Sequence, residues 1–83
     1  MNNKKVRFYY QIDFIDIDGR ATYIDTFTAR QRGKAIEHVN ILNRANQCLN
    51  GYSYYVLDKY AVSNNEYGIE IVEKNITNAK PIY

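Results

Sequence analysis

The chain has 83 residues, enough for a single domain that buries about 60% of the surface of its unfolded chain. Nine Tyr and three Phe supply large apolar areas, so one core is feasible without disulfides or a metal ion. The net charge of +2 does not mark a dedicated nucleic-acid-binding protein, and a single cysteine, Cys48, excludes an internal disulfide.

The same features predict where the protein works. One unpaired cysteine favours a reducing compartment, and residues 1–6 lack the apolar run of a signal peptide. No stretch approaches the roughly 18 apolar residues of a membrane-spanning helix, so we expect no membrane partner. Asn, Ile, Tyr and Lys supply 35 residues, and their A/T-rich codons indicate a low-GC bacterium or one of its phages. We therefore expect a cytoplasmic protein of a bacterial host cell.

The first predicted element is a β-hairpin. From Val6 to Phe14 every second residue is apolar, which is typical of a half-buried strand. Asp18-Gly19 predicts a two-residue turn, because this pair adopts positive φ at low cost. That turn pairs Ile17 with Arg20, Phe14 with Tyr23 and Tyr10 with Phe27. The alternation changes phase at Phe14-Ile15, where we expect a bulge.

A long helix follows the hairpin. Thr28 and Gln31 have the residue types and spacing of a capping box, and Asn50-Gly51 is typical of a helix C-terminus. Between them, apolar residues at helical spacing predict a stripe that faces the core: Ala35, Ile36, Val39, Leu42, Ala45 and Leu49.

Two further strands are predicted at about residues 52–62 and 67–73, with a four-residue turn at Ser63-Asn64-Asn65-Glu66. This turn pairs Val62 with Tyr67, Tyr60 with Ile69 and Asp58 with Ile71. We expect residues 1–74 to form a single α+β domain and residues 75–83 to form a polar C-terminal tail.

The element order is ββαββ, an α+β fold in which one helix packs on one face of a four-stranded sheet. A right-handed crossover through the helix would place the first and fourth strands side by side and parallel, which predicts a mixed sheet of order 2-1-4-3. This order resembles the β-grasp arrangement of ubiquitin and of small immunoglobulin-binding domains. It makes the second and third strands edges, where Asp25 and Asp58 would be inward-pointing charges that discourage strand addition.

With one helix, one face of this sheet stays open. The core face is expected to carry Val6, Phe8, Tyr10, Ile12, Tyr23, Phe27, Tyr54, Val56, Tyr60, Ile69 and Ile71. The apolar residues of the open face predict a partner-binding surface, because monomers rarely expose large apolar patches. These residues are Tyr9, Ile15, Ile24, Tyr55, Leu57 and Val72. The alternative is that the C-terminal tail folds back and covers them.

Basic residues gather at the predicted start of the helix. Arg30, Arg32 and Lys34 oppose the helix dipole there, so stability alone does not explain them. Beside free backbone N–H groups they would attract anions. Together with Arg44 they form a second candidate site, for phosphates or an acidic protein surface. The alternative is an ordinary solvated helix end.

No pattern predicts catalysis, a cofactor or a metal ion. His38 and Cys48 are ten residues apart on one helix, too far for a nucleophilic pair, and they cannot supply the four ligands of structural zinc. We expect a solvated His38 and a buried Cys48. Asp16 and Asp18 lack the spacing of a calcium loop. The sequence therefore predicts that the protein is not an enzyme.

The main functional hypothesis is a non-enzymatic protein-binding domain that uses the open face and the basic helix start. The small size and A/T-rich coding favour a phage or mobile-element product that inhibits a host protein, such as a nucleic-acid-handling defence enzyme of CRISPR immunity. The alternative is a nucleic-acid-binding module, with the basic residues on phosphates and Tyr9 or Tyr55 stacked on bases. A third hypothesis is a homodimer formed through two open faces.

Overall fold

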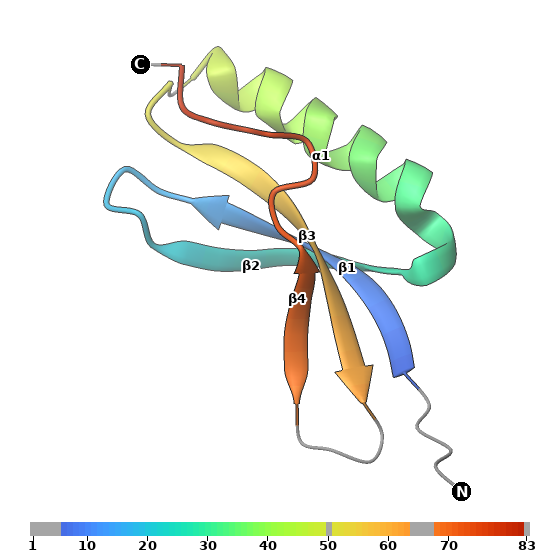
Figure 1. Ribbon diagram of the computed structural model, residues 1–83. Coiled ribbons are helices and arrows are strands. Elements are labelled where there is room, and N and C mark those ends of the chain that lie inside the picture. Colours follow the sequence, from blue (N-terminus) through green and yellow to red (C-terminus); the bar gives the residue numbers. More distant parts are fainter. Residues whose placement is uncertain (1–5, 50, 64–67, 83) are drawn as a thin grey trace, which may run out of the picture.

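A computed structural model describes residues 6–49, 51–63 and 68–82. In this part of the chain four antiparallel strands form one sheet, and one α-helix crosses one of its faces (Figure 1). The strands are β1 (Val6–Ile15), β2 (Ala21–Thr28), β3 (Tyr54–Ser63) and β4 (Ile69–Glu73). A short 3-10 helix, η1 (Ala29–Gln31), leads into α1 (Arg32–Gln47). The prediction of a small α+β fold is confirmed.

The turn between β1 and β2 has three central residues rather than the predicted two. The N–H of Asp16 donates to the carbonyl of Arg20, and the N–H of Gly19 donates to the carbonyl of Asp16. The Asp16 carboxylate accepts the N–H groups of Asp18 and Arg20, each at 2.9 Å. Gly19 has a φ of +81°. A turn closed by one left-handed residue is the usual form of a three-residue hairpin loop.

Ile24 is an extra, unpaired residue in β2, and beyond it the pairing of β1 with β2 has the predicted register. Phe14 pairs with Thr22, one residue away from its predicted partner, because the loop is one residue longer. The register then skips Ile24, and the predicted pairing of Tyr10 with Phe27 is confirmed. The bulge therefore lies in β2 and not in β1, where the sequence predicted it.

Gly19→Ala should lower the free energy of unfolding by about 1 kcal/mol, because a Cβ disfavours the left-handed backbone. No heavy atom of the described chain lies within 4 Å of the place that this Cβ would occupy, so backbone strain accounts for the effect. Gly33→Ala in α1 is the matched control, and it should raise stability by about 0.5–1 kcal/mol. Urea denaturation measures both variants, and effects of the same sign would contradict the turn assignment.

The strand order is β2-β1-β3-β4, so the predicted order 2-1-4-3 and its β-grasp arrangement are wrong. β1 lies between β2 and β3 and is antiparallel to both, while β4 is antiparallel to β3. Strand length gives the physical reason. All ten residues of β1 pair with the ten of β3, whereas β4 has only five residues. The antiparallel pair of long strands forms more hydrogen bonds than a parallel pair with β4 would form.

This order reverses the predicted faces of β3. Leu57 pairs with Ile12 and is fully buried, with an exposed fraction of 0%. The buried core consists of Tyr10, Ile12, Ala35, Val39 and Leu57. The face turned away from α1, called the outer sheet face below, carries residues that were predicted in the core: Tyr23, Tyr54, Val56, Tyr60, Ile69 and Ile71. Of these, Val56 is nevertheless buried, with an exposed fraction of 8%.

The helical region begins after Thr28 as predicted, but its first turn is the 3-10 helix η1, so α1 itself begins at Arg32, and it also ends earlier than predicted. The N–H of Thr28 donates to Gln31 Oε1 at 2.9 Å, the contact expected of the capping box. The helix stops at Gln47, before the predicted Asn50-Gly51, of which Asn50 lies outside the described residues. The first four of the six predicted stripe residues face the core: Ala35 and Val39 are buried, and Ile36 and Leu42 pack on the core, whereas Ala45 and Leu49 are exposed.

Two asparagines join α1 to the start of β3. Asn43 Nδ2 donates to the carbonyl of Tyr55 at 2.9 Å, and the N–H of Tyr55 donates to Asn43 Oδ1 at 2.7 Å. One turn further, Asn46 Nδ2 donates to the carbonyl of Ser53 at 2.9 Å. The two side-chain amides thus bind backbone groups of β3 and its preceding residue on the side that faces away from β1, where a neighbouring strand would otherwise pair.

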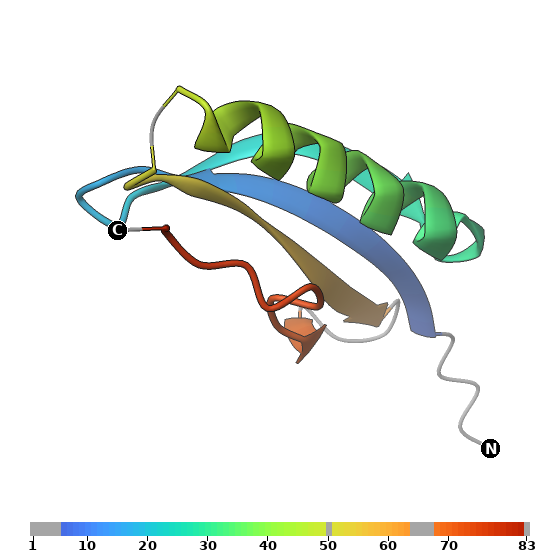
Figure 2. The same cartoon turned by 90° about the horizontal axis from the view of Figure 1, so that it is seen from above.

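The segment after β4 continues this pairing along β3 (Figure 2). The N–H of Ile76 donates to the carbonyl of Leu57, and the N–H of Ile82 donates to the carbonyl of Gly51, both at 2.8 Å. Ile76 also packs against the core. Side-chain amides, this segment and β4 thus follow one another along the same edge of β3.

The register between β3 and β4 differs from the prediction by two residues. Tyr60 pairs with Ile71 rather than with Ile69, and Val62 pairs with Ile69. The register then skips Val72 before Glu73 pairs with Lys59. Of the predicted turn, residues 64–66 lie outside the described residues. A shift of two residues keeps every side chain on the same face of the sheet.

Candidate partner-binding surfaces

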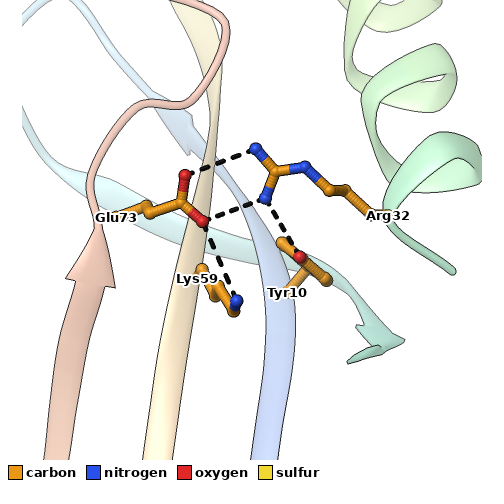
Figure 3. A network of polar contacts seen from close by, with 4 residues as sticks. All are labelled: Tyr10, Arg32, Lys59 and Glu73. Atoms are coloured by element: carbon orange, nitrogen blue, oxygen red, sulfur yellow. Dashed lines mark hydrogen bonds and ion pairs between the residues drawn. The ribbon is translucent and has the colours of Figure 1, made fainter. Parts of the chain in front are cut away.

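A polar network joins the start of α1 to β1, β3 and β4 (Figure 3). The Arg32 guanidinium donates to both carboxylate oxygens of Glu73, at 2.9 and 3.3 Å, and to the Tyr10 hydroxyl at 3.0 Å. Lys59 Nζ lies 3.9 Å from the same carboxylate and 4.7 Å from the centre of the Phe8 ring. Arg32 therefore links the start of α1 to the edge strand β4.

This network changes the predicted basic site. Arg32 donates to Glu73, and this hydrogen bond is the main reason that the pKa of the Glu73 carboxyl is lowered. Arg30 and Lys34 are exposed near the helix start. Arg44 lies in the last turn of α1, about 15 Å along the axis from Lys34. The structure therefore does not bring the four predicted basic residues together.

Glu73→Gln should destabilise the protein at neutral pH but not at strongly acidic pH. Because the pKa of Glu73 is lowered, its ionised carboxylate stabilises the fold at any pH above the usual carboxyl pKa of 4.5. This stabilisation is lost as the pH falls through the lowered pKa. Urea denaturation between about pH 3 and pH 7 measures the difference. Glu70→Gln removes the same charge from β4 outside the network and is the control. The same pH dependence in both variants would contradict the assignment.

The outer sheet face gathers aromatic and aliphatic side chains from three strands. Tyr9 pairs with Tyr60 and Tyr60 pairs with Ile71, so the three form a row across β1, β3 and β4. The rings of Tyr9 and Tyr60 are stacked, with their centres 5.1 Å apart. Val62 and Ile69 form the next row. Ile69 and Ile71 are 63% and 49% exposed, so the β4 end of both rows is open to solvent, whereas Tyr9, Tyr60 and Val62 are half-buried.

Two mostly buried carboxylates lie beside these rows. Asp58, opposite Gln11, is 5% exposed and accepts the N–H of Asn75 at 2.7 Å. Asp13 accepts Gln11 Nε2 at 2.8 Å. Burial first, and the charges of Asp58 and Asp13 next, raise the pKa of Tyr60. Asp58 thus fixes the segment after β4 to an inner strand of the sheet.

The predicted role of Asp58 as an edge-strand charge is therefore wrong, because β3 is not an edge. Asp25 does lie on an edge strand, β2, where its carboxylate accepts the N–H of Thr26 at 2.8 Å. The two acids lie on strands that β1 separates and do not form a common site.

The structure divides the six residues predicted for the open face. Tyr9 and Ile15 lie on the outer sheet face, at alternate positions of β1 from the core residues. The register skips Ile24 on β2 and Val72 on β4, which are both partly exposed. Leu57 is in the core, and Tyr55 packs against it with its ring 4.9 Å from that of Phe14. The placement of Tyr55 and Leu57 on the open face is wrong because β3 has the opposite phase.

A groove of about 850 Å³ lies where β1 runs on past its pairing with β2. The last pair of the hairpin is Tyr9 with Thr28, after which the chain turns into η1. Apolar side chains form much of its lining, and Arg7 and Arg30 are the charged residues among its described walls. The walls are Val6, Arg7, Phe8, Tyr9, Thr26, Phe27, Thr28, Ala29, Arg30 and Val62.

His38 and Cys48 do not contribute to these surfaces. His38 is half-buried rather than solvated, and its ring lies 5.7 Å from that of Phe27. Cys48 is exposed, so the prediction of a buried cysteine is wrong. Within the described ranges, no three His, Cys, Asp or Glu side chains form a group that could hold a metal ion.

The chain was compared with protein-family models, with curated proteins and with solved structures. None of them matches. In the part of the chain that the structure describes, no helix is both long enough and apolar enough to cross a membrane. The functional proposal therefore depends on the surfaces described above.

Proposed function

We propose that this chain is a protein-binding domain without catalytic activity, and that it docks on a partner protein through the outer sheet face. The carrying observation is the pair of apolar rows on that face, in which Ile69 and Ile71 are widely exposed. Contiguous exposed apolar surface usually marks an interaction site. The stacked Tyr9 and Tyr60 suit its centre, since tyrosine is enriched at interfaces.

The path of the C-terminal segment supports this proposal. Residues 75–82 follow β3 beside residues 51–58, as the bonds from Ile76 to Leu57 and from Ile82 to Gly51 require. The row of Tyr60 and Ile71 lies farther along β3, where β4 is the neighbour. The segment therefore follows the edge of the sheet and does not cross the apolar rows.

Three contacts weaken the alternative of nucleic-acid binding. Arg32 is paired with Glu73, Tyr55 packs against the core, and one face of the Tyr9 ring stacks on Tyr60. Salt separates the two proposals, because phosphate contacts weaken steeply as salt rises and an apolar interface changes much less.

The finer form of the proposal concerns the partner. The A/T-rich coding supports a phage or mobile-element protein that inhibits a host protein, and a nucleic-acid-handling defence enzyme is the partner that we propose. The composition of the chain is the support for this part of the proposal.

The test compares capture of host-cell proteins by the wild type, Ile71→Lys and Ile41→Lys. Ile41 lies on α1 and is 51% exposed, against 49% for Ile71, so the two variants make the same change on opposite sides of the molecule. Quantitative mass spectrometry should find a partner that the wild type and Ile41→Lys retain and that Ile71→Lys loses. Equal capture by all three chains, or loss with Ile41→Lys alone, would contradict the proposal.

Light scattering of the purified chain at several concentrations tests the homodimer hypothesis. Self-association through the outer sheet face should be abolished by Ile71→Lys and kept by Ile41→Lys. A dimer insensitive to Ile71→Lys would use another surface.

A further inference from the structure

We infer that the groove beside β1 binds an extended, acidic segment of the partner, which adds to β1 as a short strand. The inference rests on the proposed function, because it assigns one part of the partner protein to one part of the surface. Arg7, Tyr9 and Val62 line the groove and also lie on the outer sheet face, so the two surfaces are continuous.

The backbone of β1 is suited to accept another strand here. The Leu57 carbonyl points away from β1, because it accepts the N–H of Ile76. Its partner Ile12 therefore directs its own backbone groups toward β2, and so does every second residue of β1, down to Val6. β2 ends its pairing at Tyr9, so the backbone of Val6 points to the side that β2 has left.

Other sheet edges are less open to strand addition. Asn43, Asn46, the segment after β4 and β4 itself occupy the far side of β3. The free edge of β2 carries the bulge at Ile24 and the charge of Asp25, and the free edge of the short β4 carries the register skip at Val72 and the charge of Glu70. Bulges and charges of this kind discourage strand pairing. The start of β1 has no bulge, and Arg7, the charged residue among Val6–Tyr9, would attract rather than repel an acidic strand.

The charges of the groove select an acidic segment. Arg7 and Arg30 are exposed, and neither forms an ion pair with another described residue. No acidic side chain is among the described residues that line the groove. Phe8 and Phe27 add apolar walls, which suit the alternating side chains of an added strand. Nucleic-acid binding depends on neutralising many phosphates along the backbone, whereas the charged residues among the described groove walls are only Arg7 and Arg30, so we assign the groove to a peptide with a few carboxylates.

The test begins with a displayed library of random peptides, from which binders are selected on the immobilised wild-type chain. We expect the selected peptides to be rich in Asp and Glu and to shift the amide resonances of Phe8 and Phe27. The double variant Arg7→Glu/Arg30→Glu should bind them at least about tenfold more weakly. The control Lys34→Glu/Arg44→Glu makes the same charge change elsewhere and should bind them with little change. Oligothymidylate is titrated in parallel.

Selected peptides without acidic enrichment, binding unaffected by Arg7→Glu/Arg30→Glu, or tighter binding of oligothymidylate would each overturn the inference. Failure of the inference differs from failure of the proposed function. If only the inference fails, partner capture still depends on Ile71 and does not depend on Arg7 and Arg30. If the proposed function fails, capture does not depend on Ile71.

Discussion

Leu57→Ala should lower the free energy of unfolding by about 2–5 kcal/mol, the usual range for truncating a fully buried leucine. Leu57 is 0% exposed and lies in the core with Ile12 and Val39. Small domains have a total stability of about 5–15 kcal/mol, so this one change should remove a large part of it. Urea denaturation followed by circular dichroism measures the loss.

Leu49→Ala is the matched control for this variant. Leu49 is 86% exposed, so the same truncation should change stability by no more than about 0.5 kcal/mol. Equal effects of the two variants would show that Leu57 is not in the core. The faces of β3, and with them the outer sheet face, would then have to be reassigned.

Asn43→Leu should lower the free energy of unfolding by about 1–3 kcal/mol, although leucine is the better helix former. The reason is that Asn43 pairs with both the N–H and the carbonyl of Tyr55. Leucine leaves these two groups without their partner at a half-buried position. Thermal and urea denaturation measure the change.

Asn40→Leu makes the same substitution on α1 one turn earlier, at an exposed position. It should leave stability unchanged within about 0.5 kcal/mol or raise it slightly. Hydrogen exchange gives a second readout, since the Tyr55 amide should exchange faster in Asn43→Leu only. Unchanged protection of Tyr55 would contradict its pairing with Asn43.

Local patterns predicted the first hairpin and the helix well. Alternation in Val6–Ile15 has one phase over most of its length, and the pairing of Tyr10 with Phe27 follows from it. Thr28 and Gln31 predicted the start of the helical region, η1, because capping depends on residues three apart in the chain. The turn length was wrong, since the Asp16 carboxylate stabilises a three-residue loop that Asp18-Gly19 alone does not indicate.

The faces of β3 could not be predicted from alternation. Residues 54–62 are apolar in both phases, with Tyr54, Val56 and Tyr60 on one face and Tyr55 and Leu57 on the other. The choice between the phases depends on pairing with β1, whose partners lie about forty to sixty residues away in the chain. Strand order is a long-range property of the same kind, and a crossover rule does not determine which later strand takes the inner position.

The candidate surfaces were only partly predictable for the same reason. Arg32 and Glu73 are 41 residues apart, so no local pattern indicates that this cation is paired. The groove exists because residues 6–8 of β1 extend beyond the part of β1 that pairs with β2. A hairpin prediction with two strands of equal length does not indicate this extension. One usable indication was overlooked: Asn43 and Asn46 interrupt the buried stripe of α1, and polar residues in such a place often bind backbone groups.

The position of Tyr60 and Ile71 on the outer sheet face depends on β1 lying beside β3. The most direct test is a nuclear Overhauser measurement between the α-protons of Ile12 and Leu57, which face each other in a pair without mutual hydrogen bonds. In such antiparallel pairs the Cα atoms are about 4.5 Å apart, so a strong cross-peak is expected. Absence of this cross-peak, together with contacts from β1 to residues 69–73, would contradict the fold and the surfaces assigned to it.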